Sequence, residues 1–62
     1  MYAITYTLFT GTVIHRAPSA KAALEAMGML RMGGATVLRI EVTRNGEELS
    51  VEELRRRAEK EP

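Results

Sequence analysis

The sequence predicts one small α+β domain over residues 1–62, with its elements in the order ββαβα. Three patterns predict it. Apolar residues alternate at period two near the N-terminus and again over residues 35–44, an apolar stripe at helical spacing covers residues 20–32, and a serine–glutamate capping pattern begins at residue 50. We expect a three-stranded antiparallel or mixed sheet of order 2-1-3, with one main helix on one face and a short C-terminal helix.

The first two strands are predicted to form a hairpin. Residues 2–9 alternate aromatic or β-branched residues with small or polar ones, and residues 12–17 follow after Thr10 and Gly11. Glycine supplies the positive φ that a tight turn needs, so these two residues are the expected loop. The register that follows pairs Phe9 with Thr12, Leu8 with Val13, Tyr6 with His15 and Ile4 with Ala17.

The main helix is expected over residues 20–32, which are rich in good helix formers. Ser19 is suited to cap its first turn, and Gly33 and Gly34 are suited to end it. Gly28 inside the helix is interpreted as a point of close packing on the sheet. The core stripe comprises Ala20, Ala23, Leu24, Met27 and Leu30.

The third strand is expected over residues 35–44, with Leu38, Ile40 and Val42 facing the main helix. Asn45 and Gly46 predict a turn, and residues 47–49 are either a short strand or a loop. The capping box at 50–53 predicts a helix over 51–59. A helix this short does not persist alone, so it must dock on the rest of the domain or fray.

Open sheet edges predict that the chain associates with another. A sheet of three strands has two edges, and 62 residues bury little core, so a partner chain is expected to supply stability. We expect a homodimer that uses one edge or the face opposite the main helix. That face is expected to carry Thr5, Thr7, Phe9, Ile14, Arg16, Val37, Arg39 and Glu41, and the predicted interface residues are Phe9, Ile14, Val37, Met29 and Met32.

Composition excludes several classes. The chain has no cysteine, so neither disulfides nor thiolate metal sites are available. Its formal net charge is +1, which gives no strong field for a polyanion. No signal peptide or membrane-spanning run is visible, so a soluble cytoplasmic protein is expected.

The residues offer little catalytic chemistry. His15 is the one histidine, and Ser19 and Ser50 are better explained as helix caps. We interpret His15 as a structural residue beside Tyr6, partly covered and hydrogen-bonded; a proton shuttle or a pH-sensitive interface residue is the alternative. No catalytic residue, no metal site and no cofactor is predicted.

The sequence therefore favours a non-catalytic protein that acts by protein–protein association, as a homodimer or as an accessory subunit of a larger partner. The alternative is a weak nucleic-acid binder, in which surface arginines contact phosphates and Phe9 stacks on a base. The arginines of that alternative are Arg16, Arg39, Arg55, Arg56 and Arg57.

Overall fold

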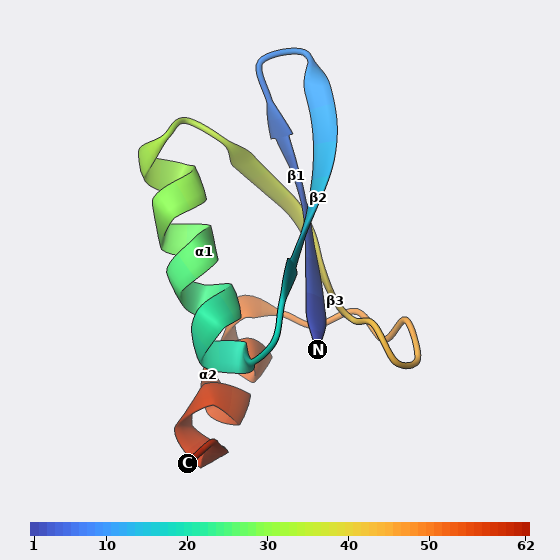
Figure 1. The fold of residues 1–62 in the computed structure, drawn as a ribbon, viewed down its shortest axis with the longest axis vertical. Coiled ribbons are helices and arrows are strands. Elements are labelled where there is room, and N and C mark those ends of the chain that lie inside the picture. The colour runs from blue at the N-terminus through green and yellow to red at the C-terminus, as the bar shows by residue number, and fades with distance from the viewer.

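The computed structural model describes all 62 residues and has the predicted architecture (Figure 1). The sheet has three antiparallel strands in the order β2-β1-β3, as expected. The main helix has the predicted bounds, and the last helix ends one residue later than predicted. The elements are β1 (Tyr2–Leu8), β2 (Gly11–Ala17), α1 (Ala20–Met32), β3 (Thr36–Val42) and α2 (Val51–Lys60).

The helix α1 covers one face of the sheet and runs alongside the strands, while the β1–β2 hairpin extends past its C-terminal end (Figure 1). Ile4 is fully buried at the centre of the sheet, and Met27 of α1 is nearly so. The core cluster comprises Tyr2, Ile4, Ala17, Ala20, Ala23, Met27, Ile40, Val42, Leu49, Leu54 and Ala58.

The helix α2 docks near the beginning of α1 and closes that end of the core. Its Leu54 is fully buried, and Ala58 one turn later is also buried. Ser50 caps it as predicted, because its Oγ accepts a hydrogen bond from the Glu53 N–H at 3.1 Å. The docking that a short helix requires is therefore present.

The hairpin register differs from the prediction by two residues. Leu8 pairs with Gly11, so the loop consists of Phe9 and Thr10. Phe9 takes the positive φ, at 57°, which was expected of Gly11. A shift of two residues keeps every side chain on its predicted face, because side chains alternate at period two. His15 consequently lies opposite Ile4 rather than Tyr6.

A β-bulge changes the predicted face of β3. Thr5 pairs with Arg39 and Tyr6 pairs with Val37, so Leu38 is the extra residue between them. Leu38 is 57% exposed, and Val37 packs against the core in its place. The prediction that Leu38 faces the helix was wrong, as was the placement of Val37 on the opposite face.

Gly28 is not a point of close packing, because a Cβ added there would meet no atom within 4 Å. Gly28→Ala is therefore expected to raise the free energy of unfolding by about 1 kcal/mol, the difference in helix propensity. Urea denaturation measures it. Gly34→Ala is the control and should destabilise, because Gly34 has a φ of 89°. A destabilised Gly28→Ala variant would show that something packs on this side of α1.

Candidate association site at the edge of the sheet

The outer edge of β2 has no partner in the fold. Leu8 and Gly11 close the two-residue loop as a hydrogen-bonded pair, and such pairs alternate along an antiparallel ladder. The backbone groups of Gly11 and every second residue after it therefore bond to β1. Those of Thr12, Ile14 and Arg16 point away from β1, into solvent.

The β3 edge is covered instead, and the expectation that both edges are open was wrong for it. Residues 47–49 return alongside β3 and form a bridge to it. The Val42 N–H donates to the Glu47 carbonyl at 2.8 Å, and the Leu49 N–H donates to the Ile40 carbonyl at 2.8 Å. These bonds, together with the bulge, protect this edge from another chain.

The β2 edge carries few of the devices that usually protect an edge strand. It has no proline, lysine or bulge, and Arg16 is its one charged residue. Six of its seven residues are exposed, including Val13 on the helix side and Ile14 on the far side. An uncovered edge flanked by apolar side chains is a template for strand addition.

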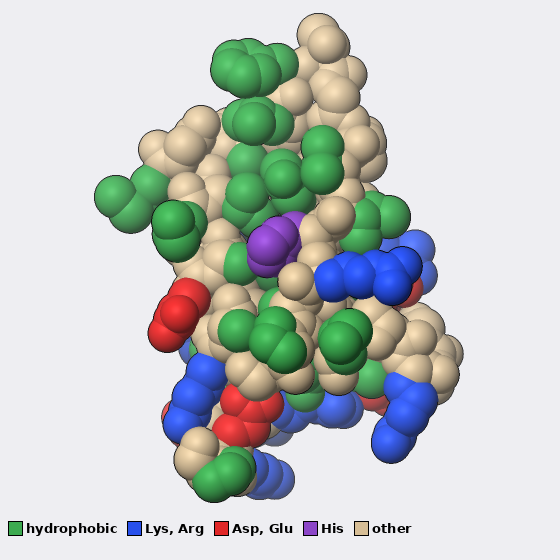
Figure 2. Space-filling view, in the orientation of Figure 1, with side chains coloured by type: hydrophobic (Ala, Val, Ile, Leu, Met, Phe, Trp, Pro, Cys, Tyr) green, Lys and Arg blue, Asp and Glu red, His purple; other side chains and the backbone are tan.

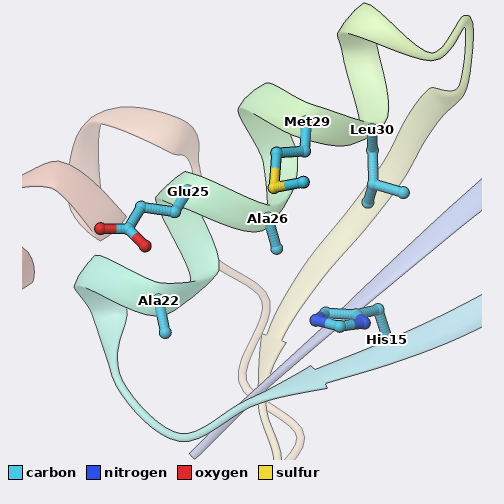
Figure 3. Close-up of a pocket in the computed structure, with 6 residues that line it drawn as sticks. All are labelled: His15, Ala22, Glu25, Ala26, Met29 and Leu30. Atoms are coloured by element: carbon cyan, nitrogen blue, oxygen red, sulfur yellow. The ribbon is translucent and has the colours of Figure 1, made fainter.

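A groove lies between β2 and α1, next to this edge (Figure 3). Its volume is about 490 Å³, and its walls are mainly apolar. His15 points from β2 toward α1, and the small side chains of Ala22 and Ala26 leave the hollow open (Figure 3). The remaining lining residues are Glu25, Met29 and Leu30.

The groove belongs to a larger apolar surface. Figure 2 shows hydrophobic side chains gathered between α1 and the hairpin, around and above His15. The His15 side chain is exposed and makes no hydrogen bond, so the predicted hydrogen-bonded position beside Tyr6 was wrong.

Sequence reasoning did not single out Ala22, Glu25 and Ala26. The available signal was a second helical stripe at residues 22, 26 and 29, beside the core stripe.

The predicted interface residues do not gather on one surface. Ile14 flanks the β2 edge, and Met29, which is 75% exposed, lines the groove. Met32 is exposed at the end of α1, outside the groove. Phe9 is 97% exposed at the hairpin tip, and its left-handed backbone costs about 1–2 kcal/mol. Two-residue hairpin loops commonly take a positive φ at their first residue, so the turn sets the backbone of Phe9.

Two of the five arginines of the nucleic-acid alternative are paired with glutamates. Arg39 lies 3.1 Å from the Glu41 carboxylate and 3.5 Å from that of Glu48. Arg57 lies 3.0 Å from the Glu47 carboxylate, and the neighbouring Tyr2 side chain, ahead of Glu47, raises the pKa of Arg57. Unpaired arginines lie on separate elements, Arg16 on β2 and Arg55 and Arg56 on α2. This arrangement does not favour binding to phosphates.

The N-terminus of α1 is closed by the chain's own C-terminal segment. The Glu61 carboxylate accepts hydrogen bonds from the Ala20 N–H at 2.7 Å and from the Lys21 N–H at 3.1 Å. Ser19 accepts from the Ala22 N–H at 3.1 Å, as predicted for the cap. The two backbone bonds lower the pKa of Glu61, with the Lys21 charge as a smaller cause.

Acid is expected to remove this contribution to stability. Because the folded-state pKa of Glu61 is depressed, its contribution is fully present above the ordinary value of about 4.5 and is lost as the pH falls through the lower folded-state value. Urea midpoints should therefore show Glu61→Gln less stable than the natural chain at pH 7, with a smaller gap at pH 3. Glu59→Gln, at an exposed glutamate with no hydrogen bond or ion pair, should show no gap. A Glu61→Gln gap that is the same at both pH values would contradict the assignment.

Comparisons with protein-family models, with curated proteins and with solved structures found no match to this chain. Neither helix is long and apolar enough to cross a bilayer. The candidate site therefore rests on the geometry of β2 and α1.

Proposed function

We propose that this chain is a non-catalytic association module that acts as a homodimer, formed by antiparallel pairing of β2 with β2 of a second copy. One observation carries the proposal: the β2 edge is uncovered and flanked by exposed apolar side chains, while the chain covers its other edge. The homodimer would contain one continuous six-stranded sheet.

The size of the chain supports a second subunit. A folded chain of 6.9 kDa ordinarily exposes about 4,000 Å². This chain exposes 4379 Å², roughly a tenth more. A second copy on the β2 edge would cover part of this exposed surface.

The β2 edge is also complementary to itself. The residues with outward-pointing groups, Thr12, Ile14 and Arg16, are symmetric about Ile14. Full overlap of two β2 strands therefore pairs Ile14 with Ile14 of the second copy, and Arg16 with Thr12 of the second copy. No like charges face each other, which removes the usual obstacle to self-pairing.

Sedimentation equilibrium across a range of protein concentrations tests the proposal. The expected result is a mass that rises with concentration to twice the chain mass of 6.9 kDa. A mass that stays at 6.9 kDa up to millimolar concentration would overturn the homodimer. Of the two predicted forms of association, only the accessory subunit of a larger partner would then remain. Low-salt binding to an oligonucleotide pool that disappears at high salt, with no self-association, would instead favour the nucleic-acid alternative.

A further inference from the structure

The groove between β2 and α1 lies on the side of the proposed second copy. We infer that α1 packs against α1 of the second copy across a two-fold axis, and that Met29 of each copy fills the groove of the other. This inference rests on the proposed function and names what covers the apolar surface beside the sheet edge.

The symmetry of the sheet places both helices on one face. Two antiparallel strands paired in one sheet are related by a two-fold axis perpendicular to it, and full overlap puts that axis at Ile14. Such an axis does not exchange the faces of the sheet. The two α1 helices therefore lie side by side above the paired β2 strands, and they run antiparallel.

The two-fold axis passes beside α1, level with about Ala26. A strand rises about 3.3 Å per residue, so Ile14 lies roughly 10 Å from Ala17 along β2. A helix rises about 1.5 Å per residue, so the same distance reaches from Ala20 to about Ala26. The groove supports this estimate independently, because it brings together Ala26 and His15, the neighbour of Ile14.

The side of α1 that faces the groove has the shape that such packing requires. Ala22, Ala26 and Met29 are spaced i, i+4 and i+7, so they share one side of the helix. Antiparallel packing centred on Ala26 places Met29 of one copy beside Ala22 of the other. The small side chains of Ala22 and Ala26 leave the groove open. A methionine side chain is flexible and can adapt to an irregular apolar hollow of this kind. Glu25, the one carboxylate of the groove, is exposed in the single chain.

A strand edge alone is too small an interface. Stable complexes bury about 800 Å² per partner, which is more than the edge of a seven-residue strand offers. The adjacent surface that can add area is the groove with Met29, together with Val13 on the same face. This requirement favours helix packing over a sheet contact alone.

Alanine substitutions of two methionines test the inference. Met29→Ala is expected to raise the dissociation constant of the dimer at least tenfold, measured by sedimentation equilibrium. Met32→Ala is the matched control, because Met32 is on the same helix, is even more exposed and does not line the groove. Equal effects of the two substitutions would overturn the inference.

Cross-linking separates this inference from the proposed function. The chain has no cysteine, so each single-cysteine variant carries one reactive thiol. A short bis-maleimide should join two copies of Ala26→Cys rapidly. It should not join Met32→Cys, whose thiols lie about 18 Å apart along the helix axes. Ile14→Cys, at the strand pairing, should form a disulfide between copies on oxidation.

The outcomes are distinguishable. Joining of Ile14→Cys without joining of Ala26→Cys would overturn the helix packing and keep the sheet dimer. Failure of both variants, with a monomer mass for the natural chain, would overturn the proposed function itself. Joining of Met32→Cys as fast as Ala26→Cys would show that the helices meet elsewhere.

Discussion

Ile14→Pro is expected to convert the dimer into a folded monomer. The Ile14 N–H points away from β1, so proline removes no hydrogen bond within the chain. It removes a donor that the second copy would use, and its ring blocks the edge. We expect the dissociation constant to rise at least a hundredfold, measured by sedimentation equilibrium, while circular dichroism retains the α+β spectrum.

Two controls sharpen this result. Ile14→Val keeps the backbone donor and a β-branched side chain, so it should dimerise nearly as well as the natural chain. Val13→Pro removes an N–H that bonds to β1, so it should destabilise the hairpin itself. Retention of the dimer mass by Ile14→Pro would show that β2 is not the interface.

Leu54→Ala is expected to lower the free energy of unfolding by about 2–5 kcal/mol, the usual range for a buried leucine. Leu54 is fully buried and is the one large residue that α2 inserts into the core. A domain of 62 residues has little stability to lose, so this variant should be largely unfolded at moderate urea concentrations.

Urea denaturation followed by circular dichroism measures this loss. Leu38→Ala is the control, because Leu38 is 57% exposed at the bulge, and it should change the stability by no more than about 0.5 kcal/mol. A loss below about 1 kcal/mol for Leu54→Ala would mean that α2 does not close the core as described.

The order of elements could be predicted because it depends on local signals. The bounds of α1 follow from the Ser19 cap, a continuous run of helix formers and the two glycines after Met32, all of which are visible in the sequence. The capping box at residues 50–53 likewise predicted where α2 begins. The strand order then followed from the short hairpin and the single crossover.

The hairpin register and the β3 bulge could not be predicted in this way. Glycine is the usual residue at a positive φ, yet Phe9 occupies that position and Gly11 begins β2. Unbroken alternation over residues 36–42 gives no sign of an extra residue at Leu38. Both features depend on how strands fit each other and the core, and not on local preference.

The candidate site was predicted only in part. An open edge and exposed Ile14 and Met29 followed from the topology and the pattern. The groove did not, because it is made by the small size of Ala22 and Ala26 and by the distance between α1 and β2. The cover on the β3 edge and the bond from Glu61 to Ala20 join segments that no local pattern connects.

Amide hydrogen exchange along β2, measured by NMR at several protein concentrations, tests the central claim most directly. In the single chain, Val13 and His15 bond to β1, whereas the amides of Thr12, Ile14 and Arg16 face solvent. We predict that at high concentration these three amides become as protected as those of Val13 and His15, and that dilution removes their protection alone. Rapid exchange of the Ile14 amide at a concentration where the mass is that of a dimer would contradict pairing through β2.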